Sequence, residues 1–183
     1  MLMELDKATL MVIDVQDKLI PAIDEGERLS ARLQWLISAC QLLGTPILFT
    51  EQYPKGLGHT QQALTVLVEQ PVVMEKLHFS AVAANCLPEG WQRHSQVIVC
   101  GMEAHVCVLQ TVMDLLKAGK EVFVVADGVG SRTEENRQLG LARMRDAGAR
   151  IVSREMVVFE LMHQSGTELF KTISKQFLVG EQP

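Results

Sequence analysis

The alternation of short, strand-like apolar runs with longer helix-like segments constrains the fold of this chain more than any other feature. The strand-like runs are Thr9–Ile13, Pro46–Phe49, Pro71–Met74, Val97–Cys100, Glu121–Ala126 and Arg150–Val152. The helix-like segments between them are Glu27–Leu43, Thr60–Glu69, His105–Ala118 and Thr133–Ala147. Strands that are apolar on both faces and alternate with helices form a parallel sheet covered on both sides. We therefore expect a three-layer α/β/α fold with a mainly parallel sheet of about six strands.

Length and charge narrow the class further. The chain has 183 residues without a linker or repeat, and an ordinary domain has about 150, so we expect a single domain over residues 1–183. Lys plus Arg is 17 and Asp plus Glu is 22, which gives a net charge of −5. This acidity argues against a nucleic acid or an anionic membrane as partner. Apolar runs too short for a bilayer and the lack of a signal-peptide pattern predict a soluble, cytoplasmic protein. The partner that we expect is a small-molecule substrate.

The chemistry of such a fold is expected at one edge of the sheet. In open α/β sheets, ligands bind beyond the carboxyl ends of the strands. The polar or flexible residues at these ends are Asp14, Glu51, Lys76, Gly101 and Asp127. Any one of them by itself is explained equally well by a strand that returns to solvent. A site at this edge therefore requires several of them to act together.

Cys107 is the most informative of the four cysteines. It lies in the first turn of the helix that follows the strand ending at Cys100, where free N–H groups and the helix dipole stabilise a thiolate. A small residue packed at a helix start explains this position equally well. However, a thiol nucleophile needs a base, and the base needs charge balance. Asp14 and Lys76, from two other strand ends, have the chemistry for these roles.

The other three cysteines are expected to be ordinary buried thiols. We predict Cys40 and Cys86 in helical segments and Cys100 in a strand. A nearby Ser131-x-x-Glu134 pattern has the form of a capping box and predicts the start of the following helix.

Three segments carry a resemblance to a known family. They are the strand end Asp14-x-Gln16, the segment Lys76-x-x-Phe79-Ser80, and the turn from Gly101 to Cys107. The chain resembles the isochorismatase-like cysteine hydrolase superfamily over nearly its whole length. Within it, two further stretches resemble the branch of isochorismatase domain-containing proteins of undefined substrate, namely Thr50–Gly58 and Leu141–Arg145. The resemblance implies the Rossmann-like α/β fold of that superfamily.

The resemblance also implies a catalytic triad in which Cys107 is the nucleophile, Asp14 the general base and Lys76 the charge partner. It implies a non-proline cis peptide bond between Met102 and Glu103. The backbone N–H groups of Glu103 and Cys107 would then form an oxyanion hole, which stabilises the negative charge of the transition state.

Four further residues are candidates for substrate contacts. Glu51 and Tyr53, together with Gln52, follow the second strand beside the active edge. Gln16 belongs to the first motif of the resemblance. His105 matches an Ala-His pair of isochorismatase-like turns, although a purely helix-capping role remains open.

The chain departs from the metal-binding members of the superfamily. The nicotinamidases bind a metal through a D-x-H-type motif and further histidines after the second strand. Here that region reads TEQYPKGLGHT, with no Asp and with His59 as its one histidine. A metal site needs three or four suitable ligands. We therefore expect no metal and no cofactor, and the Gly-x-Gly pieces do not form a dinucleotide-binding G-x-G-x-x-G pattern.

The family name does not define the substrate. Isochorismate is a dianion that calls for basic pocket residues, and only Lys55 and Arg132 are available once Lys76 is assigned to the triad. Isochorismatases also lack a nucleophilic cysteine at the position of Cys107. The sequence thus predicts a metal-independent cysteine hydrolase that cleaves a small amide or related C–N bond through a thioester.

Two alternatives to this hydrolase remain. One is a non-catalytic isochorismatase-like scaffold that acts through protein partners, since fold does not determine function. The other is a redox-sensing thiol, for which Cys100 is the nearby resolving candidate. For the assembly, the resemblance implies a homodimer or homotetramer, and the stretch from Met156 to Met162 offers an apolar surface for it.

Overall fold

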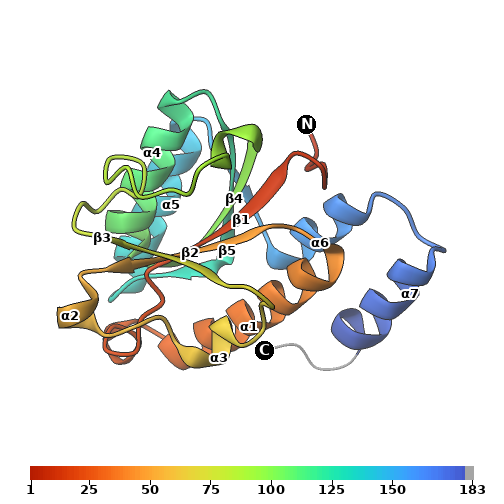
Figure 1. Ribbon diagram of the computed structural model, residues 1–183, viewed down its shortest axis with the longest axis horizontal. Coiled ribbons are helices and arrows are strands. Elements are labelled where there is room, and N and C mark those ends of the chain that lie inside the picture. The colour runs from red at the N-terminus through yellow and green to blue at the C-terminus, as the bar shows by residue number, and fades with distance from the viewer. Residues whose placement is uncertain (180–183) are drawn as a thin grey trace.

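The computed structural model describes residues 1–179 and contains a parallel six-stranded sheet with the order β3-β2-β1-β4-β5-β6 (Figure 1). The strands are β1 (Ala8–Ile13), β2 (Ile47–Gln52), β3 (Val72–Lys76), β4 (Gln96–Met102), β5 (Glu121–Gly130) and β6 (Arg150–Val152). Each of the six predicted strand-like runs corresponds to one of these strands. The predicted α/β class and the parallel direction of the sheet are confirmed.

Helices cover both faces of this sheet (Figure 1). The α-helices are α1 (Gly26–Leu43), α2 (Pro54–Leu57), α3 (Gln62–Thr65), α4 (Leu109–Lys117), α5 (Glu134–Asp146), α6 (Arg154–Met162) and α7 (Glu168–Ile173). Shorter helical turns are η1 (Ile20–Ala22), η2 (Trp91–Arg93), η3 (Ala104–Val108) and η4 (Ser174–Leu178). Helices α1 and α6 pack on one face, and α4 and α5 pack on the other, which gives the three predicted layers.

Strand β1 shows why the strand-like runs are apolar on both faces. Leu10 and Val12 pack into the core beneath α1 and α6, whereas Met11 and Ile13 pack into the core beneath α4 and α5. All four side chains are fully buried. A central strand of a doubly covered sheet requires this composition, because successive side chains point to opposite faces.

The C-terminal apolar stretch divides between core and surface. Helix α6 buries Val157, Val158 and Leu161 in the core, whereas Met156 and Phe159 are about half exposed. The predicted homodimer or homotetramer remains a prediction, with these two exposed side chains as one candidate contact. The predicted helix Thr60–Glu69 is shorter than expected and is reduced to α3.

Candidate active site

Asp14 and Lys76 form a buried ion pair at the carboxyl edge of the sheet. Asp14 directly follows β1, and Lys76 ends β3, on the far side of β2. Lys76 Nζ donates a hydrogen bond to Asp14 Oδ2 at 2.6 Å, and the hydroxyl of Thr50 in β2 donates to Oδ1 at 2.6 Å. The two ionised side chains have exposed fractions of only 0% and 1%. Burying two charges is unfavourable unless they are paired and hydrogen-bonded, so a pair of this kind marks a candidate functional site.

Gln52 joins this ion pair to Cys107. Its Oε1 accepts a hydrogen bond from Lys76 Nζ at 2.8 Å, and Cys107 Sγ makes a long contact of 4.0 Å with the same oxygen. Gln52 Nε2 donates to the Leu77 carbonyl at 2.8 Å, which keeps the amide oxygen turned toward the ammonium. The sequence interpretation placed Gln52 only near the pocket. Its position at the end of β2, between the strands that carry Asp14 and Lys76, was the available signal.

Cys107 lies in η3, the π-helical turn that follows β4, and is 5% exposed. Close contact between β4 and β1 brings this turn near Asp14. At Gly101 a side chain is excluded, because a Cβ there would lie 2.1 Å from the Ile13 carbonyl oxygen. The glycine also adopts a φ of 128°, which L side chains rarely adopt.

The electrostatic surroundings of Cys107 favour a neutral thiol at rest. Burial raises the pKa of Cys107 most, and the negative charge of Asp14 raises it further, whereas Lys76 lowers it. The site therefore holds a neutral thiol beside the Asp14 carboxylate, which is paired with Lys76. A carboxylate in this position can accept the thiol proton as the sulfur attacks a carbonyl carbon.

The predicted cis peptide bond between Met102 and Glu103 is wrong. No peptide bond among the described residues is cis. The turn is made instead by a left-handed conformation of Glu103, with φ 57° and ψ 66°. The oxyanion hole assigned to the N–H groups of Glu103 and Cys107 remains a prediction.

Gln16 is buried and contacts backbone groups. Its Nε2 donates to the carbonyls of Gln52 and Gly58 at 3.1 Å and 2.6 Å, and its Oε1 accepts from the Gln52 N–H at 2.8 Å. Gln16 also forms an isolated antiparallel bridge with Thr60. Both amide protons are thus used within the protein, which favours a structural role over the predicted substrate contact.

Glu51, like Gln16, forms hydrogen bonds that hold the segment between β2 and α3 in place. Its Oε1 accepts the Thr60 N–H at 2.6 Å, and its Oε2 lies 3.1 Å from His59 Nδ1. The Glu51 side chain is buried, whereas the His59 ring is largely exposed. Together with Gln16, Glu51 fixes the segment between β2 and α3 against the end of β1.

Tyr53 remains available for a ligand. It directly follows β2, is 51% exposed, and lines a cavity of about 530 Å³ that also includes Lys76 and Leu77. Of the predicted substrate contacts after β2, Tyr53 is the one whose side chain reaches open space. The cavity lies at the same edge of the sheet as the ion pair.

The predicted capping box at Ser131 is wrong. Helix α5 is capped by Thr133, whose side chain accepts the Asn136 N–H, and Glu134 pairs with Arg137. Strand β5 continues to Gly130, so Ser131 lies too close to the sheet to cap the helix. The Ser131 hydroxyl instead lies 3.0 Å from His105 Nδ1. His105 is therefore held by the end of β5, beside the turn that carries Cys107.

The other cysteines are only partly as predicted. Cys40 in α1 and Cys100 in β4 are fully buried, as expected. Cys86 lies in the loop between β3 and β4 rather than in a helix, and it is partly exposed. Burial raises the pKa of Cys86, while Lys76 lowers it and Asp14 raises it, so this thiol lies within the field of the same ion pair.

Cys100 is badly placed as a resolving thiol for Cys107. It packs in the core beneath α1, whereas Cys107 packs in the core beneath α4 and α5. The sheet separates the two sulfur atoms, which removes the partner on which the redox-sensor alternative depended.

Within residues 1–179, no three His, Cys, Asp or Glu side chains gather in an arrangement that could hold a metal ion. No helix within the same residues has the length and apolar character needed to cross a membrane.

Comparison with known proteins gives a consistent family. Residues 8–156 match the model of the isochorismatase domain. Isochorismatase domain-containing protein 2A of Mus musculus is 35% identical over 171 residues, which cover 93% of this chain and 82% of that protein. The structure of MAR1 ribonuclease from Caenorhabditis elegans has a TM-score of 0.92 at 34% identity and covers 100% of this chain and 95% of the other.

A more distant structure shares the fold. YcaC from Pseudomonas aeruginosa, determined with hexane-2,5-diol and covalent acrylamide, has a TM-score of 0.85 at 22% identity. It covers 97% of this chain and 92% of its own. The domain match over most of the chain and the close similarity to the mouse protein show that this chain belongs to the isochorismatase domain family, a branch of the isochorismatase-like hydrolase superfamily.

Proposed function

We propose that this protein is a metal-independent cysteine hydrolase that cleaves a small amide or a related C–N bond. The observation that carries the proposal is the buried hydrogen-bonded row of Asp14, Lys76 and Gln52, which ends beside the Cys107 sulfur. A thiol, a carboxylate and an ammonium supply the nucleophile, the base and the charge balance that nucleophilic catalysis requires.

In the acylation step, Asp14 accepts the Cys107 proton as Sγ attacks the substrate carbonyl carbon. Asp14 then gives the proton to the nitrogen of the tetrahedral intermediate. The C–N bond breaks, and this nitrogen leaves as ammonia or an amine. A thioester between Cys107 and the acyl group remains. Water then attacks this thioester, Asp14 accepts its proton, and breakage of the C–S bond releases the carboxylic acid. The proton on Asp14 returns to the sulfur, which restores the resting thiol.

Lys76 balances the negative charge of the Asp14 carboxylate. Its ammonium donates to Asp14 at 2.6 Å and to Gln52 at 2.8 Å, and both contacts hold the ammonium in place while the thiol proton is transferred. The backbone N–H groups of Glu103 and Cys107 are the proposed oxyanion hole. Removing one donor of such a hole lowers turnover by about 100- to 1000-fold in known enzymes.

A panel of small primary amides, with ammonia release as the readout, tests the proposal. We expect turnover with at least one amide, loss of turnover in Cys107→Ala, and no change in rate after prolonged chelation. A rate that falls on chelation and returns with zinc, iron or manganese would contradict metal independence. A well-folded protein without turnover on the whole panel would support the scaffold alternative.

Acrylamide is a useful second probe, because it is both a primary amide and a thiol-reactive alkene. The YcaC structure contains covalent acrylamide, and we infer that an amide of this size can also enter the present site. Mass spectrometry of the labelled protein would identify the modified cysteine. Modification of Cys86 in preference to Cys107 would count against the proposed nucleophile.

The name of the Caenorhabditis elegans protein suggests a control. That protein is called a ribonuclease, whereas the present chain has a net charge of −5, and phosphate binding favours basic surfaces. Incubation with single-stranded and double-stranded RNA should therefore leave the RNA intact. Cleavage that is lost in Cys107→Ala would replace the amide hydrolase proposal.

A further inference from the structure

We propose that Glu103 and Arg132 form a positioning pair. The pair holds the nucleophile turn, residues 103–108, and it balances the charge of the Glu103 carboxylate beside Cys107. The inference rests on the proposed function, in which Cys107 is the nucleophile. It assigns a role to Arg132, which lies next to a serine whose pattern predicted only a helix cap.

The pair connects a buried acid to a half-exposed base. Arg132 Nε lies 2.7 Å from Glu103 Oε1, and the side-chain exposed fractions are 58% for Arg132 and 12% for Glu103. The other carboxylate oxygen, Oε2, is buried without a hydrogen bond, and His105 Nδ1 lies 3.4 Å from it. Arg132 is thus the closest basic partner of a carboxylate that is nearly removed from water.

Glu103 also anchors the turn through its backbone. Its carbonyl accepts the N–H groups of Val106 at 2.9 Å and Val108 at 3.3 Å, on either side of Cys107. Its left-handed φ of 57° sets the direction in which the chain leaves β4. A residue with a side chain in this conformation is uncommon and needs support from its surroundings. The contact with Arg132 supplies part of that support.

A contact between Ser131 and His105 lies next to the ion pair of Glu103 and Arg132. Ser131 and Arg132 are consecutive residues after β5, and the end of β5 pairs with the end of β4 through Gly130 and Met102. Ser131 contacts His105, and Arg132 contacts Glu103. Two neighbouring residues of one loop therefore hold two residues of the nucleophile turn.

Helix α5 closes the remaining side of the turn. A Cβ at Gly140 would lie 2.9 Å from the Ala104 carbonyl oxygen and 3.1 Å from the His105 Cα. The helix therefore packs directly on the turn, and its start follows the loop that contains Arg132. The turn is enclosed by β4, the β5–α5 loop and α5.

The position of Glu103 has an electrostatic consequence. The charged groups that act on Cys107 are Asp14 after β1, Lys76 at the end of β3, and Glu103 in its own turn. The negative charge of Glu103 disfavours the thiolate. Arg132 offsets this charge, and the contact between them is partly shielded from solvent, so its effect exceeds that of a fully exposed ion pair.

The pH dependence of Cys107 alkylation by acrylamide tests the pair without a known substrate. Arg132→Gln should move the midpoint of labelling to higher pH by about half a unit, a change of about threefold in rate at lower pH. Glu103→Gln should move it to lower pH, and the double variant should return close to wild type. Arg145→Gln, the same change at an exposed position of α5, should leave the midpoint unchanged.

The outcomes separate this inference from the proposed function. If Cys107 reacts as proposed but the midpoint is the same in wild type and Arg132→Gln, the positioning pair is wrong and the hydrolase proposal stands. If Cys107 does not react in the wild type at any pH, both fail. Circular dichroism and thermal unfolding check each variant. Should Glu103→Gln not fold, Arg132→Gln and its rescue by Arg132→Lys decide the question, because a lysine retains the positive charge.

Discussion

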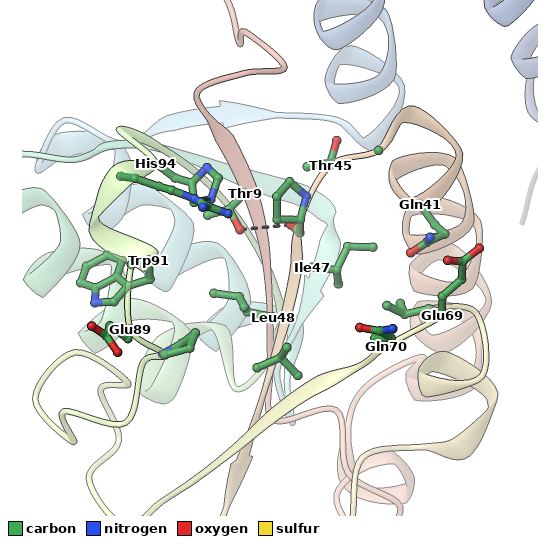
Figure 2. A pocket seen from close by; sticks show the side chains of 17 residues that line it. Thr9, Gln41, Thr45, Ile47, Leu48, Glu69, Gln70, Glu89, Trp91 and His94 are labelled. Atoms are coloured by element: carbon green, nitrogen blue, oxygen red, sulfur yellow. Dashed lines mark hydrogen bonds between the residues drawn. The ribbon is translucent and has the colours of Figure 1, made fainter.

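The two edges of the central sheet differ in the charged and reactive side chains that lie beside their cavities. At the amino edge, around the starts of β1 and β2, lies a hollow of about 540 Å³ (Figure 2). Its lining includes Thr45, Trp91 and His94 but contains no cysteine. At the carboxyl edge, Asp14 and Lys76 are almost completely enclosed. A cavity of about 530 Å³ lies at the carboxyl edge as well. Open volume therefore does not distinguish the two edges, whereas the buried ion pair beside a cysteine does.

The polar side chains at the amino edge form contacts that hold η2 against the start of β5. His94 Nε2 accepts a hydrogen bond from Arg93 Nε, and Lys120 Nζ donates to the carbonyls of Gln92 and His94 at 2.6 Å and 2.7 Å. The Lys120 ammonium also lies 4.9 Å from the centre of the Trp91 ring. These contacts tie η2 to the start of β5. They stabilise a loop and provide no nucleophile beside a base.

The largest expected effect is a difference in turnover between variants at the two edges. Cys107→Ala should lower turnover by at least about four orders of magnitude, because loss of a nucleophile removes the covalent route. Arg93→Gln, at the exposed rim of the amino-edge hollow, should change kcat/KM by less than about twofold. Steady-state kinetics on an amide substrate measure both variants. A severe loss in Arg93→Gln would show that the amino edge contributes to catalysis.

The second prediction concerns stability at the carboxyl edge. Lys76→Met should destabilise the protein by about 3–5 kcal/mol, because it leaves the Asp14 carboxylate buried without its partner. The double variant Asp14→Leu/Lys76→Met should recover much of this loss, since neither charge is then buried alone. Urea unfolding at pH 7 measures both. Equal stability of wild type and Lys76→Met would mean that the ion pair is not buried in solution.

The two edges also show which features of the fold and the site can be predicted from the sequence. Strand periodicity and the rule that ligands bind at carboxyl ends bring Asp14, Lys76 and Cys107 to one edge, since a parallel sheet places its strand ends together. Ser131 shows the limit. Its spacing to Glu134 satisfies a capping pattern, but β5 extends to Gly130 and turns the serine toward His105. Residue spacing along the chain cannot show that Ser131 contacts His105 in the folded protein instead of capping α5.

Gln52 and Cys86 show a second limit. The Gln52 amide becomes informative only when β1, β2 and β3 are side by side, because its partners are 24 and 55 residues away in sequence. Cys86 lies in a loop without periodic apolar spacing, so its approach to the ion pair leaves no local pattern. The predicted elements follow from short-range periodicity, whereas these contacts depend on strand order and loop path.

The third prediction compares two thiols near the same ion pair. Acrylamide at neutral pH should label Cys107 before Cys86, although Cys86 is the more exposed, because Asp14 can accept the Cys107 proton during the reaction. Lys76→Met should slow labelling of Cys107. Peptide mapping by mass spectrometry follows both sites, and Cys86→Ser is the control that removes the competitor. Similar labelling rates for the two thiols would indicate that Cys107 is a packing residue.

The smallest expected effect belongs to the amino edge and concerns pH. Burial lowers the pKa of His94, and the positive charges of Arg93 and Lys120 lower it further. The unfolded chain therefore binds a proton at this residue at a higher pH than the folded chain does. The stability that the neutral ring provides is fully present above the unfolded pKa of about 6.5 and is lost as the pH falls toward the lower folded pKa.

His94→Gln should accordingly flatten the fall in stability between pH 7.5 and pH 5, measured as the free energy of unfolding in urea, whereas His78→Gln at an exposed position should not. The pH profile of turnover should be the same in His94→Gln and wild type, because the proposed nucleophile and its proposed base lie at the opposite edge. If His94→Gln shifts the activity profile, the two edges are energetically coupled and the division of roles between them is wrong. If it leaves the stability profile unchanged, His94 is already hydrated in the folded protein, and the amino-edge loop opens more readily than its contacts indicate.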